Sequence, residues 1–135
     1  MSSCEEKFFE AAQRHWLDAE ILFERGRFAN ADQLYGLAAE CVLKAIWEPH
    51  VNGIKNFRVH MDENKLIKNI ITFFNLRTHI SLLNLIPEDS PYDDWAITQR
   101  YCSESIITLI RVQSHREWTR KCFELFRNAN LDGLL

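Results

Sequence analysis

Two amphipathic segments near the start of the chain, separated by only a few residues, constrain its fold most. In the first, apolar side chains recur every three or four positions, at Phe9, Ala12, Trp16, Ala19 and Phe23. That spacing places them on one stripe of an α-helix. A capping-box spacing from Ser3 to Glu6 predicts the start of this helix, and Gly26 predicts its end.

The second segment starts only a few residues later. Asn30 is predicted to be its N-cap, with Gln33 three positions on, and Pro49 with Gly53 is expected to end it. The apolar face consists of Ala31, Leu34, Tyr35, Ala38, Val42, Ala45 and Ile46. Because the connection is so short, the two helices must lie antiparallel as a hairpin.

The rest of the chain is predicted to complete an all-α fold. The pattern predicts a helix from Asp62 through Phe74, a shorter one over 77–86, a loop at 87–94 and a last helix through about Arg127. The buried side of the last helix is expected to contain Ile107, Ile110, Ser114, Trp118, Cys122 and Leu125. Residues 95–102 fit either an extended or a helical turn. With only 4 glycines and 3 prolines in 135 residues, we expect one domain, an antiparallel up-and-down bundle of four to five helices.

The charge distribution excludes one class of function. A net charge of −3 argues against a dedicated DNA-binding domain, whose affinity rests on neutralising phosphates. Residues 1–50 hold five Lys or Arg and nine Asp or Glu, whereas residues 100–127 hold six and three. This asymmetry allows either solvated faces that balance each other or a local anion-binding face.

No cofactor or metal site is expected from the sequence. The four cysteines, Cys4, Cys41, Cys102 and Cys122, lack metal-ligand spacing, and no glycine-rich phosphate loop is present. Cys41 and Cys122 fall at apolar helix positions and are expected to be small buried side chains. The first residues lack an apolar signal core and no apolar run approaches membrane length, so we expect a reduced, cytoplasmic protein without a membrane partner.

The second helix raises a separate question, because Gly36 lies in its interior. A glycine there costs about 1 kcal/mol relative to alanine, which predicts a large neighbour such as Trp16 or Trp118. Glu40 and Lys44 have the favourable i, i+4 order. They form either an exposed pair beside a packed seam or the edge of a groove or dimer contact. In the first helix, His15 lies one turn before Asp18, a pair that fits a structural role or the same groove.

The hairpin resembles the one that opens HEPN domains. The matching stretch is HWLDAEILFERGRFANADQLYGLAAECVLKAI, residues 15–46. Its matching positions are Asp18, Ala19, Glu20, Leu22, Ala31, Leu34, Ala38, Glu40, Leu43 and Lys44. The segment DDWAITQRY, residues 93–101, is similar to a tryptophan and Arg-Tyr segment that precedes the final helix in some members.

The resemblance implies a HEPN-like helical bundle that forms homodimers. Many members are metal-independent RNases of toxin–antitoxin pairs, often beside a nucleotidyltransferase partner, and others are binding modules without activity. Active members carry an arginine and a histidine separated by four to six residues, the arginine holding the phosphate and the histidine moving a proton. Here the nearest pair is Arg111 and His115, with three residues between them. On a helix they share a face and can contact one phosphate, or they form a solvated surface.

Three functions follow from this resemblance. The first is a non-catalytic binding or partner module in RNA or nucleotide biology. The second is a metal-independent RNase that uses Arg111 and His115 as catalytic residues. The third is a helical protein-interaction module. Arg100 and Tyr101 are candidates for nucleotide or phosphate binding, because an arginine binds phosphate and a tyrosine stacks on a base. The alternative for this pair is structural, with Arg100 bridging to an acid of the first helix and Tyr101 packing on the bundle.

Overall fold

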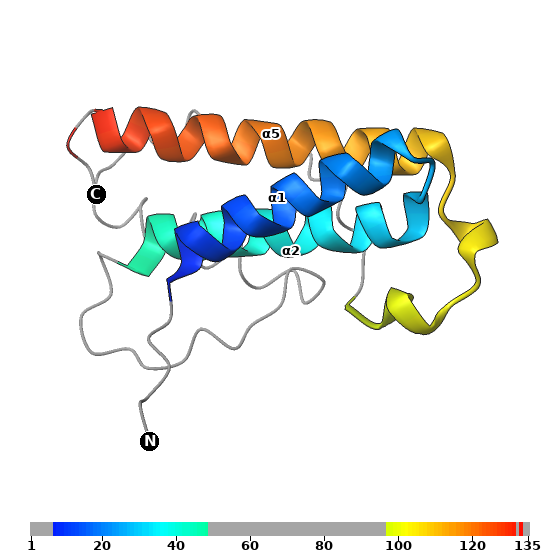
Figure 1. Cartoon of the computed structure of the whole chain (residues 1–135). Coiled ribbons are helices and arrows are strands. Elements are labelled where there is room, and N and C mark those ends of the chain that lie inside the picture. The colour runs from blue at the N-terminus through cyan, green and yellow to red at the C-terminus, as the bar shows by residue number, and fades with distance from the viewer. Residues whose placement is uncertain (1–6, 49–96, 132, 134–135) are drawn as a thin grey trace, which may run out of the picture.

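All secondary structure is helical in residues 7–48, 97–131 and 133, the residues that the computed structural model describes (Figure 1). The elements are α1 (Phe8–Glu24), α2 (Phe28–Trp47), η4 (Ile97–Tyr101), η5 (Glu104–Ile106) and α5 (Leu109–Leu131). The predicted all-α class is therefore confirmed for these residues. The predicted Ser3–Glu6 capping box, the helices between residues 62 and 86 and the loop at 87–94 lie outside them. Residues 95–102, which fit either an extended segment or a helical turn, contain the short 3-10 helix η4.

The turn between α1 and α2 forms as the glycine predicts. Gly26 has a φ of 72°, a left-handed conformation that glycine adopts without steric cost. Its N–H donates to the Phe23 carbonyl at 3.0 Å, and the Arg27 N–H donates to the Leu22 carbonyl at 2.8 Å. This pair of bonds closes the end of α1 and turns the chain directly into α2.

The start of α2 corrects the prediction that Asn30 is its N-cap. The helix begins at Phe28 with Arg27 as N-cap, and the Ala31 N–H donates to the Arg27 carbonyl at 3.0 Å. The turn at Gly26 already places Arg27 at the N-cap position, so the helix begins before Asn30. Asn30 is an exposed residue of the first turn.

The core forms where α2 packs against both α1 and α5. Small buried residues on the facing sides, Ala12 and Ala19 of α1 and Ala31 and Ala38 of α2, allow close approach. Gly36 is also buried. Its predicted contact with a large side chain such as Trp16 or Trp118 stays a prediction. The predicted antiparallel hairpin is visible in Figure 1, where α1 and α2 run back along each other.

Aromatic side chains join α1 to the other two helices. The rings of Trp16 and Tyr35 lie 5.3 Å apart between α1 and α2. Phe9 stacks on Phe126 of α5 at 4.1 Å, and Trp16 meets Phe123 edge to face at 5.6 Å. Such contacts add about 0.5–1.5 kcal/mol each beyond the area that they bury. They hold α1 against α5 through side chains.

The last helix differs from its predicted pattern in two respects. It extends to Leu131, past the predicted end near Arg127, and Ala129 in this added turn is buried. Ile110 is 80% exposed and Ser114 is exposed, although both were predicted to face the core. The buried face consists of Val112, His115, Trp118, Thr119, Cys122, Leu125 and Ala129. Two polar residues, His115 and Thr119, belong to this face. The spacing of apolar residues alone therefore predicted a different buried face.

Among the described helices, none combines the length and the apolar character that crossing a membrane requires.

Candidate functional site

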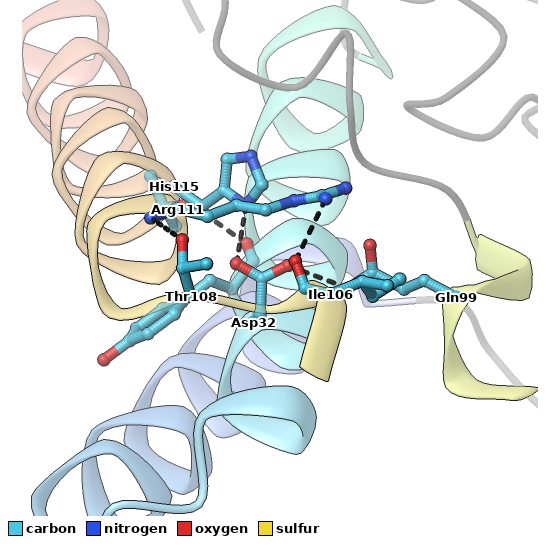
Figure 2. A network of polar contacts seen from close by, with 8 residues as sticks. Asp32, Gln99, Ile106, Thr108, Arg111 and His115 are labelled. Atoms are coloured by element: carbon cyan, nitrogen blue, oxygen red, sulfur yellow. Dashed lines mark hydrogen bonds and ion pairs between the residues drawn. The ribbon is translucent and has the colours of Figure 1, made fainter. Parts of the chain in front are cut away.

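A buried contact between Asp32 and His115 joins α2 to α5 (Figure 2). His115 Nδ1 lies 2.5 Å from Asp32 Oδ1, and both residues are 0% exposed. An ionised carboxylate only accepts hydrogen bonds, so Nδ1 is the donor in this contact. The sequence pattern identified His115 and missed Asp32.

Gln99 of η4 completes this contact from a third element. Its Nε2 donates to Asp32 Oδ2 at 2.8 Å, and the side chain is 8% exposed. Both oxygens of the Asp32 carboxylate are therefore engaged, one by α5 and one by η4, as Figure 2 shows. We call Asp32, Gln99 and His115 the buried polar cluster.

Arg111 lies one helical turn before His115 and is half-buried. Its Nη1 donates to the Ile106 carbonyl at 3.4 Å, and its backbone N–H donates to Thr108 Oγ1 at 3.2 Å. The guanidinium thus lies beside the buried polar cluster, on the segment that leads into α5 (Figure 2). The shared face predicted for Arg111 and His115 is present, whereas the alternative that both form a solvated surface is wrong for His115.

Within the buried polar cluster, Asp32 and His115 have the composition of an acid–base pair, because a carboxylate that binds one imidazole nitrogen fixes the orientation of the ring. Such a pair acts in catalysis only if the reacting group lies within hydrogen-bond reach of the other ring nitrogen. His115 has no exposed surface. In this conformation the cluster therefore braces three elements, and its histidine presents almost no surface to an external substrate.

The Arg100–Tyr101 pair lies in η4. Tyr101 is 77% exposed, so most of its surface is not packed on the bundle. Its proposed stacking on a base stays a prediction. The side chain of Arg100 lies outside the described residues, and its proposed phosphate contact stays a prediction.

A second polar cluster links α1 to α5 and α2 near the surface. Arg116 binds both carboxylate oxygens of Glu20, with Nε at 2.6 Å from Oε1 and Nη2 at 2.9 Å from Oε2. Tyr35 donates its hydroxyl to the same Glu20 Oε1 at 2.6 Å. The Arg116 guanidinium also lies 4.9 Å from the Phe23 ring centroid. Arg116 of α5 therefore bridges to an acid of α1, whereas the bridge predicted for Arg100 stays a prediction.

These contacts shift the ionisation of all three groups. The hydrogen bonds from Arg116 lower the pKa of Glu20, and those same bonds raise the pKa of Arg116. Burial, followed by the hydrogen bond to Glu20, raises the pKa of Tyr35. The shift in Glu20 makes part of the folding free energy depend on pH.

We expect the Glu20→Gln substitution to flatten the pH dependence of stability in acid. Because the pKa of Glu20 is lower in the folded state than the ordinary 4.5, its contribution is complete above 4.5 and disappears as the pH falls through the folded pKa. For a partly exposed pair, we expect a contribution of about 0.5–1 kcal/mol. Urea unfolding at a series of pH values measures it, and Glu24→Gln, an exposed acid of the same helix, is the control. An equal change in both variants would contradict the assignment.

The remaining candidate residues belong to the hairpin, with His15 and Asp18 in α1 and Glu40 and Lys44 in α2. The Glu40–Lys44 pair is buried, with Nζ 3.5 Å from Oε2 and side-chain exposures of 5% and 7%. The interpretation as an exposed pair is therefore wrong, and Lys44 lies 5.7 Å from the Phe8 ring centroid. Asp18 is exposed and His15 is half-buried. Burial and then Arg14 lower the pKa of His15 below 6.5, against the opposing effects of Asp18 and Glu40.

The prediction of a small buried side chain is confirmed for Cys122, whereas Cys41 is half-buried. Burial raises the pKa of the Cys122 thiol well above its ordinary value, and burial followed by Glu40 raises that of Cys41 to about 11. Both thiols are therefore protonated and unreactive near neutral pH. Within the described residues, no group of three or more His, Cys, Asp or Glu is arranged to hold a metal ion.

No family model matches the chain, and neither a curated protein nor a solved structure matches it.

Proposed function

We propose that this chain is a HEPN-like helical module that binds a partner in RNA or nucleotide biology without catalysing a reaction. The resemblance of residues 15–46 supports the RNA or nucleotide context. The proposal rests on the interior position of His115, which supports the absence of catalysis. His115, the histidine of the Arg111–His115 pair, has 0% exposure and binds buried Asp32. The proposal includes homodimerisation and a nucleotidyltransferase-type partner protein, both implied by the same resemblance.

A metal-independent RNase is the second candidate function. The contact from Asp32 to His115 Nδ1 favours it, because a carboxylate orients the catalytic imidazole in many acid–base pairs. Arg111 lies on the same face one turn away, where a phosphate held by its guanidinium would be close to the ring. This function requires His115 to become accessible in a conformation different from the present one.

An RNA-cleavage assay in the presence of a chelator separates the two functions. We expect the purified wild-type protein to leave single-stranded RNA intact, and its expression to leave growth unchanged. If the chain is an RNase, the wild type cleaves RNA and arrests growth. Arg111→Ala then cleaves RNA at least about 100-fold more slowly and no longer arrests growth, because removing one group that stabilises phosphate charge has that order of effect.

Two checks keep this assay decisive. Lys121→Ala removes an exposed cation of the same helix that lies outside the buried polar cluster, and it serves as the matched control. Circular dichroism verifies that each variant is folded. Cleavage that survives in Lys121→Ala and disappears in Arg111→Ala would replace the binding module with the RNase.

A further inference from the structure

A groove of about 590 Å³ runs between α1 and α5 on the surface of the molecule. Trp16 of α1 and Phe123 of α5 line it and contact each other edge to face at 5.6 Å. Arg120 and Arg127 line it from α5, and Leu17 lines it from α1. The groove therefore combines aromatic rings with two cationic side chains.

The outer face of α1 continues the apolar surface of this groove. Leu17 is 62% exposed and Ile21 is 51% exposed. They are four residues apart, so they lie on one side of the helix and form a short apolar strip. Single exposed apolar residues are ordinary, but a strip that adjoins an aromatic-lined groove has the character of an interface.

The charges on the two walls are opposite. Helix α1 has a net charge of −3, and α5 has a net charge of +3 with His115 counted as neutral. The charged residues of α1 are Glu10, Arg14, Asp18, Glu20 and Glu24, and those of α5 are Arg111, Arg116, Glu117, Arg120, Lys121, Glu124 and Arg127. Within one copy, the bidentate pair of Glu20 and Arg116 already shows this complementarity.

Part of the charge on each wall is not used inside the molecule. Within the described residues, Arg127 makes no ion pair, and Arg120 makes one, with exposed Glu117 at 3.2 Å. The charge of Arg120 also acts on Glu20. Glu10 and Glu24 on α1 are exposed. The groove thus fits an acidic amphipathic helix with two apolar anchors one turn apart, and α1 itself meets this description.

We infer that the groove between α1 and α5 is an interface between two copies of this chain, in which the outer face of α1 of one copy docks on the groove of the other. Leu17 and Ile21 supply the apolar contact, and the acids of α1 face Arg120 and Arg127. Leu17 belongs to both the strip and the groove, so the two surfaces adjoin on one face of the molecule. A two-fold axis through that face lets the strip of each copy meet the groove of the other, and the contact then closes as a dimer. This inference rests on the homodimer included in the proposed function, and it assigns a surface to that dimer.

Other apolar side chains are exposed elsewhere on the molecule. Tyr101, Ile106, Leu109 and Ile110 are 77%, 41%, 46% and 80% exposed, respectively. None of them lines the groove between α1 and α5. Ile110 therefore provides a direct control, because a substitution there changes an exposed apolar residue of α5 without touching the groove.

The test measures the molar mass of the full chain by light scattering during size-exclusion chromatography, at about 1–100 µM, a range that resolves micromolar dissociation constants. We expect the wild type to be a dimer and Leu17→Lys to dissociate at least about 100-fold more readily, since lysine removes an apolar anchor and repels Arg120 and Arg127. Ile110→Lys is expected to leave the dimer unchanged. Arg127→Glu, which opposes the acids of α1, is expected to weaken the dimer about tenfold.

Three outcomes would overturn the assignment. The first is a wild-type protein that is monomeric over the whole range. The second is a dimer that Ile110→Lys dissociates and Leu17→Lys does not. The third is a dimer that neither lysine variant nor Arg127→Glu weakens. The last two leave the homodimer intact and reject only this surface, whereas RNA cleavage rejects the non-catalytic function and leaves the surface untouched.

Discussion

Replacing Asp32 with alanine is expected to lower the free energy of unfolding by about 3–5 kcal/mol, the usual cost of removing one partner from a buried charged contact. Asp32 is 0% exposed and accepts hydrogen bonds from His115 at 2.5 Å and from Gln99 at 2.8 Å. The alanine variant leaves both donors in the interior without this acceptor, and water does not replace it unless the helices separate.

Urea unfolding followed by circular dichroism measures this effect as a lower midpoint at an unchanged slope. Asp18→Ala is the matched control, because Asp18 is an exposed aspartate on the neighbouring helix. A surface change of this kind is expected to stay within about 0.5 kcal/mol. Asp32→Asn keeps the shape and one acceptor oxygen, so we expect a loss between those of the alanine variant and the control. Equal losses in Asp32→Ala and Asp18→Ala would refute the bracing role of the cluster.

A double-mutant cycle then isolates the contact between Asp32 and His115. If the two side chains act as a pair, the losses in Asp32→Ala and His115→Ala do not add in the double variant, and the coupling energy falls in the range of about 0.5–3 kcal/mol. Additive losses would mean that each residue stabilises the fold through other neighbours. A large coupling energy would mean that Asp32 holds the His115 ring in the interior, where it cannot reach an external substrate.

The helical hairpin could be predicted from sequence because its determinants are local. The apolar stripes, the short connection and Gly26 all act within a few residues, and the left-handed glycine ends α1 as expected. The boundary of α2 was less predictable, since Arg27 and Asn30 both precede a helical pattern. Hydrogen bonds from the preceding turn decided between them.

The buried polar contacts could not be predicted, because their partners are distant in sequence. His115 lies 83 positions from Asp32, Gln99 lies 67 positions from it, and Arg116 lies 96 positions from Glu20. A polar residue in a helical pattern is most often exposed, so periodicity indicated no partner for Arg116, and it placed Ile110 in the core. Thr119 is a further example: it is buried because its hydroxyl donates to the Tyr35 carbonyl at 3.0 Å.

The same distinction explains the outcome for the candidate site. Arg111 and His115 were selected by their spacing in α5, which is a local property, and the structure does place them on one face. Whether such a face points inward or outward depends on the helix that packs against it. Here Asp32 of α2 turns His115 inward. A polar partner one helix away therefore places the histidine of the motif in the interior.

Replacing Tyr35 with alanine is the other substitution with a large expected effect, a loss of about 3–5 kcal/mol for a buried aromatic side chain. Tyr35 is 0% exposed at the centre of the hairpin. Its ring lies 5.3 Å from that of Trp16 and 6.4 Å from that of Phe23. Alanine leaves a cavity between α1 and α2 that neither ring can fill without moving the helices. Thermal and urea unfolding of the variant measure the loss.

Tyr35→Phe separates the ring from the hydroxyl. Phenylalanine keeps the packing and removes only the hydrogen bond to Glu20 Oε1, so we expect a loss of about 1–2 kcal/mol. Glu20 keeps both bonds from Arg116, which limits the effect. Tyr101→Ala is the control of the same residue type, since its ring is 77% exposed, and it is expected to change stability by less than about 0.5 kcal/mol. A loss in Tyr35→Phe as large as in Tyr35→Ala would mean that the hydroxyl network, and not the packed ring, holds α1 to α2.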